Sequence, residues 1–138
     1  PERVAKHAAA FITAMQAAGV AACAKHFPGH GDTLTDSHLE LPRLEHDLDR
    51  LREVEFPPFR AAVAAGVASM MTAHVLFPRL DKTRPATLAP DVMNLLREEL
   101  GYDGVVFSDD LEMKAVADHY QPEPLVRGCL EAAGVRGA

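Results

Sequence analysis

The sequence has little cysteine, no cluster of lysine and arginine, and no long apolar run. A transmembrane helix needs about 20 consecutive apolar residues, so we expect no membrane span. The two cysteines, Cys23 and Cys129, each lie in an apolar stretch, which favours small core residues over a disulfide or a reactive thiol. The first residues, PERVAKHAAAF, do not resemble a signal peptide.

The chain has fewer basic than acidic residues: 14 Lys and Arg against 20 Asp and Glu, which gives a formal net charge of −6. An acidic surface repels phosphates, so we expect neither a nucleic acid nor an anionic membrane as partner. Hydrophobic residues make up 48% of the 138 residues and charged ones 25%, which is typical of a globular protein. This length predicts a single domain over residues 1–138.

A pattern of helix, glycine and strand recurs along the chain. Each predicted helix ends in a glycine that can terminate it, and a short apolar run follows, typical of a buried strand. Charged residues of both signs alternate over 40–53 and indicate a solvated helix face. The helices are predicted over a first segment carrying Val4, Ala8, Phe11, Ile12 and Met15 and ending at Gly19, and over 57–66, 90–101 and 123–134; the strands are predicted over 20–27, 67–75 and 104–110.

Alternating helices and apolar strands predict an α/β fold whose parallel sheet is covered on both faces. A fourth strand would begin at Val135, where the sequence is about to end. A (β/α)8 barrel, a TIM barrel, needs about 250 residues, so we interpret the chain as a fragment of one, with a small open α/β sheet as the alternative.

Polar residues collect where each predicted strand ends. The carboxyl ends of parallel strands meet at one edge, so these residues predict a site there. His74 has a second interpretation, as a buried histidine that caps its strand, and Asp110 as a cap for the segment after it. The residues are Lys25 and His26 after the first strand, Thr72, Ala73 and His74 in the second, and Ser108, Asp109 and Asp110 in the third.

The segment KHFPGHGDTLTDSH, residues 25–38, has the greatest density of proton-transferring groups. His26, His30 and Asp32 are types of residue that bind zinc. However, Pro28-Gly29 breaks the helix on which such pairs usually depend, and His30 and Asp32 can instead shape the loop by hydrogen bonds. We therefore keep a metal-dependent hydrolase as an alternative and expect no metal.

An acid and base pair is the stronger hypothesis. Asp36 and His38 are two residues apart, so in an extended stretch they project to the same side, and a carboxylate orients an imidazole for proton transfer. Asp109 supplies a second carboxylate from another strand end. A proton donor facing an anionic nucleophile is the arrangement that glycoside cleavage requires.

Three motifs resemble the β-N-acetylglucosaminidases of glycoside hydrolase family 3, the NagZ type. They are AKHFPGHGDTLTDSHLELP, FPPFRAAVAAGVASMMTAHV and GYDGVVFSDDLEMKAV, which occur in the family's order and cover most of residues 1–121. The resemblance implies a (β/α)8 barrel, of which this chain would hold roughly strands 5 to 7 with flanking helices. It also implies retaining hydrolysis of terminal β-linked N-acetylglucosamine without a cofactor.

By this resemblance Asp109 matches the nucleophile that forms a glycosyl-enzyme. His38 matches the acid/base on a mobile loop, and Asp36 its dyad partner. Lys25 and His26 match residues that bind sugar hydroxyls, and we add His74 to the substrate-binding candidates.

The implied substrate is a β-N-acetylglucosaminide or muropeptide, and the implied role is cell-wall peptidoglycan recycling in the bacterial cytoplasm. The family draws further sugar-binding residues from strands that would precede residue 1, so we expect an incomplete barrel that self-associates. Two rival hypotheses within this fold stay open: an inactive sugar-binding remnant, and a phosphorylase that passes the same intermediate to phosphate.

Overall fold

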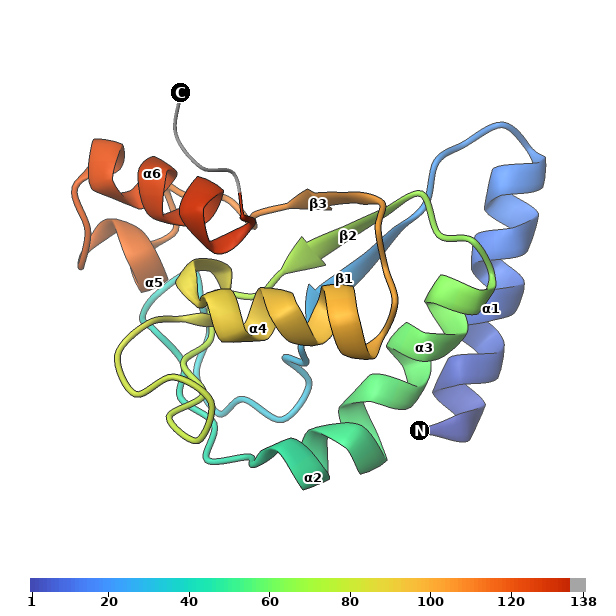
Figure 1. Cartoon of the computed structure of the whole chain (residues 1–138), viewed down its shortest axis with the longest axis horizontal. Helices are drawn as coiled ribbons and strands as arrows, with labels where there is room; N and C mark the ends of the chain where they lie inside the picture. The colour runs from blue at the N-terminus through green and yellow to red at the C-terminus, as the bar shows by residue number, and fades with distance from the viewer. Residues whose placement is uncertain (135–138) are drawn as a thin grey trace.

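The computed structural model describes residues 1–134; the fourth strand predicted from Val135 lies outside them. The fold is α/β, as predicted, and its sheet has three parallel strands in the order β1 (Cys23–Phe27), β2 (Ser69–Thr72) and β3 (Val105–Phe107) (Figure 1). Each strand lies inside its predicted range and is shorter than it.

The four predicted helices are all present. Gly101, which follows the third of them, has a φ of 69°, a left-handed conformation that favours glycine and explains why that helix ends there. The helical elements are α1 (Glu2–Ala17), α2 (Leu48–Arg50), the π-helical η1 (Leu51–Glu55), α3 (Phe56–Ala64), the 3₁₀-helical η2 (Ala86–Leu88), α4 (Pro90–Asn94), the π-helical η3 (Leu95–Glu99), α5 (Lys114–Ala117) and α6 (Pro122–Ala132).

The second helix begins earlier than predicted. The chain is helical from Leu48 through α2, η1 and α3, because the Asp47 carboxylate accepts a hydrogen bond from the Arg50 backbone N–H at 2.9 Å and caps the helix. The solvated helix face predicted over 40–53 is therefore correct only from Leu48 onward. Before it, Arg43 forms an isolated β-bridge with Leu76.

One face of the sheet packs on the main core. Ala24 of β1 and Val106 of β3 pack against this core, and Met70 of β2, between them, is fully buried. Phe27 lies at the centre of it: its ring stacks on Phe56 at 5.7 Å between centroids and meets Phe59 edge-on at 5.2 Å. The helix from Leu48 to Ala64 is thereby fixed against the end of β1.

The opposite face of the sheet is open in the described part of the chain. Val105 is 57% exposed and Phe107 51%, and Cys23 is exposed as well. The prediction of a sheet covered on both faces, and of Cys23 in a core, is therefore wrong for residues 1–134. Successive residues of a strand point to opposite faces, so an apolar run does not show which of its members are covered. Cys129 is half-buried, and both cysteines are free thiols.

No helix within residues 1–134 is both long enough and apolar enough to span a bilayer.

Gly29 offers a test of how tightly the loop after β1 is held. Its φ is 147°, and a Cβ built there would lie 2.5 Å from Cγ of Glu55. We expect Gly29→Ala to lower the free energy of unfolding by about 2 kcal/mol, since it adds both backbone strain and a steric clash.

Urea unfolding at constant pH measures this loss. Gly31→Ala is the matched control, because a Cβ at Gly31 meets nothing within 4 Å. Equal stability of the two variants would show that Glu55 does not confine the loop.

Candidate active site

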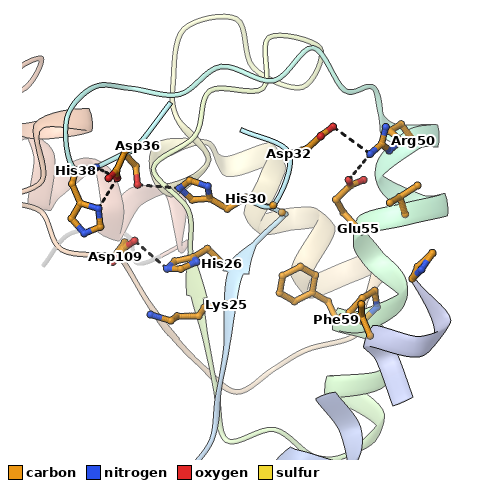
Figure 2. Close-up of a pocket in the computed structure, with 17 residues that line it drawn as sticks. Lys25, His26, His30, Asp32, Asp36, His38, Arg50, Glu55, Phe59 and Asp109 are labelled. Carbon is orange, nitrogen blue, oxygen red and sulfur yellow. Dashed lines mark hydrogen bonds and ion pairs between the residues drawn. The ribbon is translucent and has the colours of Figure 1, made fainter. Parts of the chain in front are cut away.

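A groove of about 760 Å³ lies where the carboxyl ends of β1 and β3 meet the loop after β1 and the helix that begins at Leu48 (Figure 2). Its volume falls within the usual range of small-molecule sites. Five of the six predicted site residues line it: Lys25, His26, Asp36, His38 and Asp109. The sheet therefore brings residues from two strand ends and one loop to a single cavity.

His26 and Asp109 form the inner pair of this groove. His26 Nε2 lies 3.4 Å from Asp109 Oδ2, and both side chains are mostly shielded from solvent. Burial lowers the pKa of His26, and the nearby Asp109 carboxylate partly opposes this effect. The arrangement holds a carboxylate oxygen of Asp109 beside the His26 imidazole at the end of the sheet.

Asp36 and His38 form an outer pair on the loop. Asp36 Oδ1 lies 2.7 Å from His38 Nδ1 and also accepts a 2.9 Å hydrogen bond from the His38 backbone N–H. Because a carboxylate only accepts, Nδ1 carries a proton and Nε2 is left for a ligand. These two bonds, the backbone one first, lower the pKa of Asp36. The side chains are 59% and 74% exposed, so the pair is open to solvent.

His74 is fully buried and is not among the residues that line the groove. Its Nε2 donates to the Asp110 carbonyl oxygen at 2.9 Å, and its Nδ1 lies 2.9 Å from Thr87 Oγ1. This burial does not fit the prediction that His74 binds substrate. It fits the second interpretation, a buried histidine whose two ring nitrogens are both hydrogen-bonded. Burial lowers its pKa. Its bond to Asp110 fixes the segment that carries Asp109.

The suggested metal ligands do not come together. The rings of His26 and His30 meet edge to face, 5.5 Å between centroids. Asp32 instead lies 3.0 Å from His46 Nε2 and 3.5 Å from Arg50. Within residues 1–134, no three His, Cys, Asp or Glu side chains are grouped so that they could hold a metal ion.

The sequence did not identify the wall of the groove opposite the sheet. Arg50 lies in the groove wall between Asp32, at 3.5 Å, and Glu55, at 3.1 Å, and so joins the loop after β1 to the helix (Figure 2). The alternation of charges before PPF was the only signal, and it indicates a solvated helix equally well. The other wall residues of this helix are Val54, Pro58 and Phe59.

Comparison with known proteins shows the family to which the chain belongs. The model of the glycosyl hydrolase family 3 N-terminal domain matches residues 1–135. Beta-hexosaminidase A of Pseudoalteromonas piscicida is 42% identical over 135 residues, which cover 88% of this chain and 23% of that protein. Beta-hexosaminidase of Methylococcus capsulatus is 44% identical over 128 residues, which cover 91% of this chain and 38% of that protein.

Two solved structures are also similar. A glycoside hydrolase family 3 beta-N-acetylglucosaminidase from Paenibacillus sp. has a TM-score of 0.85 and 51% identity, covering 88% of this chain and 23% of that one. NagZ from Neisseria gonorrhoeae, in complex with N-trifluoroacetyl-D-glucosamine, has a TM-score of 0.84 and 38% identity, covering 96% of this chain and 37% of that one.

The chain therefore belongs to glycosyl hydrolase family 3, in the N-terminal domain of that family. The resemblance drawn from the three motifs is confirmed. The chain spans well under half the length of the two beta-hexosaminidases, 23% and 38%.

Buried His74 and partly buried His26 predict how stability depends on pH. The pKa values of His26 and His74 are lowered in the folded state, so below about pH 6.5 the unfolded chain binds more protons than the folded one. Stability is therefore present above that pH and is lost as pH falls toward the lowered values. Carboxylates such as Asp36, whose pKa is also lowered, contribute a separate loss below about pH 4.5.

Urea unfolding at pH 7.5, 6.5 and 5.5 measures this dependence. We expect His74→Gln to flatten the slope between pH 7.5 and 5.5. His7→Gln, at an exposed histidine of α1, is the matched control. A wild-type stability that does not fall over this range would contradict the prediction.

Proposed function

We propose that the protein hydrolyses terminal β-linked N-acetylglucosamine with retention of anomeric configuration. The observation that carries the proposal is one groove that holds Asp109 from the end of the sheet together with the Asp36–His38 pair. Family membership and the names of the relatives support the substrate class, since they include a beta-N-acetylglucosaminidase and beta-hexosaminidases. A muropeptide substrate, peptidoglycan recycling and a cytoplasmic location stay predictions drawn from the resemblance.

In the first step a carboxylate oxygen of Asp109 attacks the anomeric carbon, and the bond to the leaving oxygen breaks. His38 Nε2 gives its proton to that oxygen. Asp36 stabilises the positive charge that the ring carries as an acid, because it accepts the hydrogen bond from Nδ1.

In the second step the now neutral imidazole takes a proton from water, and the water oxygen attacks the anomeric carbon. The ester to Asp109 breaks, and the carboxylate and the protonated His38 are restored. One water is consumed in each cycle. Lys25 and His26, which line the groove beside Asp109, bind sugar hydroxyls in this proposal.

Asp109→Asn tests the nucleophile in the protein at its full natural length. We expect turnover of 4-nitrophenyl β-N-acetylglucosaminide to fall by roughly 10⁴-fold or more, as when a nucleophile is lost elsewhere. Mass spectrometry of the wild-type protein, quenched during turnover, is expected to find the glycosyl adduct on the peptide that holds Asp109.

Asp110→Asn is the matched control: within residues 1–134 its side chain accepts one hydrogen bond, from the Glu112 backbone N–H, which an asparagine oxygen also accepts. A larger loss in Asp110→Asn would reject Asp109 as the nucleophile. An Asp109→Asn variant that binds sugar as the wild type does, beside an inactive wild type, would favour the sugar-binding remnant. A rate that requires phosphate, with a sugar phosphate as product, would favour the phosphorylase.

We also infer that the three strands are part of a larger (β/α)8 barrel. The open sheet face supports this, since Val105 and Phe107 are about half exposed, and so does the small share of its relatives that the chain spans. Further strands of the same barrel would cover this face.

The 138-residue chain on its own should then self-associate through the open face. Burying a Phe stabilises association by about 1.5–3 kcal/mol, so we expect Phe107→Ser to raise the dimer dissociation constant about tenfold or more. Sedimentation velocity measures this, with Phe11→Ser as the control, since Phe11 is an exposed phenylalanine of α1, away from the open sheet face. A monodisperse monomer that unfolds cooperatively would contradict the barrel inference.

A further inference from the structure

His30 lies between the inner and outer pairs of the groove, and neither step of the proposed reaction uses it. Its ring packs edge-on against His26, whose Nε2 is 3.4 Å from Asp109. On its other side (Figure 2 shows the His30 ring between His26 and Asp36), Nε2 of His30 lies 3.0 Å from Oγ of Ser37. Ser37 stands directly between Asp36 and His38 in the chain. His30 therefore contacts both halves of the site.

The hydrogen bond from Thr33 to the His30 carbonyl favours the tautomer of His30 with its proton on Nδ1. The Thr33 hydroxyl donates its one hydrogen to the His30 carbonyl at 3.0 Å. The same oxygen lies 2.9 Å from His30 Nδ1, so Nδ1 must be the donor in that contact. In the neutral ring Nε2 is then an acceptor, and the Ser37 hydroxyl donates to it. In this pattern Nδ1 of His30 donates to Thr33, and Nε2 accepts from Ser37.

Ser37 is the buried member of the loop that carries the outer pair. It is 4% exposed, whereas Asp36 and His38 are largely exposed, and its carbonyl accepts a 3.3 Å hydrogen bond from Ala115 N–H. In the described part of the chain, the Asp36 and His38 side chains hydrogen-bond only with residues of their own pair. The position of the pair over the groove therefore depends on how Ser37 is held.

We propose that His30 is a positioning residue for the proton donor: through Ser37 it places the Asp36–His38 pair over Asp109. It exchanges no proton with the substrate. This inference rests on the proposed function for its kinetic consequence, and on hydrogen bonds of the described residues for its structural one. It assigns a role to the first half of the PGHGDTLTDSH loop, which the proposed mechanism leaves without one.

A misplaced proton donor has a kinetic signature that a general loss of structure lacks. Leaving groups that depart as stable anions need little protonation, whereas poor leaving groups depend on it. We expect His30→Asn to lower kcat/KM by about 10²-fold for phenyl β-N-acetylglucosaminide. For the 2,4-dinitrophenyl substrate we expect a loss at least tenfold smaller. Equal losses on both substrates would overturn the inference.

Glutamine in place of His30 is expected to keep the hydrogen bond to Ser37 that asparagine loses. Gln can place its carbonyl oxygen near the position of Nε2 and accept from Ser37, whereas Asn is shorter and reaches only toward Thr33. His30→Gln should therefore recover most of the activity on phenyl β-N-acetylglucosaminide. Ser37→Ala should reproduce the His30→Asn defect, and combining Ser37→Ala with His30→Asn should add little to either. Additive losses in that combination would also overturn the inference.

A structural readout separates this inference from the proposed function. The amides of Leu39 and Glu40 donate to the Asp36 carbonyl at 2.9 and 3.1 Å and report on loop order. We expect their hydrogen exchange to accelerate about tenfold or more in His30→Asn and in Ser37→Ala, but not in His30→Gln, while the exchange of β2 amides stays unchanged. If the wild type hydrolyses no substrate, the proposed function fails, and the exchange rates alone decide the role of His30. Unchanged exchange in folded variants would overturn it.

Discussion

The register of the three parallel strands is the constraint on which the site depends. Cys23, Ser69 and Val105 form one row across the sheet. Because the strands run the same way, their carboxyl ends meet at one edge, and the residues that follow each strand are brought together from distant parts of the sequence. β1 loses its regular pairing between Ala24 and Phe27, at Lys25 and His26. Such irregularities re-aim side chains, and here both residues of the irregular stretch line the groove.

The sequence was sufficient to predict the three strands, four of the helices and the edge at which the candidate site residues gather. Helix-ending glycines and short apolar runs are local signals, and the parallel topology then requires Asp109 and His26 to share an edge. The position of the loop after β1 could not be predicted from local signals, because Pro28-Gly29 shows only that the chain turns. The side of the groove on which Asp36 and His38 lie depends on contacts such as His30 with Ser37, which spacing does not reveal.

Burial was the least predictable property. His74 and His26 have similar sequence environments, each at the end of an apolar run, yet one is fully buried and the other lines the groove. The difference depends on Thr87, which is 13 residues further along and offers His74 a buried partner. Likewise Cys23 and Phe107 are exposed because no part of residues 1–134 covers their side of the sheet. Neither the burial of His74 nor the exposure of Cys23 and Phe107 can be predicted from the neighbouring residues in the sequence.

The two carboxylates proposed for the reaction are held in different ways, and the difference suits their roles. Asp109 follows a strand and lies in a segment that is fixed by the bond from buried His74 to Asp110. A nucleophile benefits from such rigidity, because attack requires alignment with one carbon atom. Asp36 and His38 lie on a solvent-exposed loop, where the imidazole can exchange protons with water between the two steps.

Exposure has a cost for a proton donor, because a loop in water has many conformations. Burying the Asp36–His38 pair would remove that freedom but also the access to water that the second step uses. The structure separates the two needs along the chain: Ser37, between the pair, is buried and bonded, while its neighbours are open to solvent. A single buried hydroxyl can therefore order the loop without desolvating the groups proposed to transfer protons. By the same proposal His30, whose ring receives the hydrogen bond of that hydroxyl, is the residue on which the geometry of the donor depends.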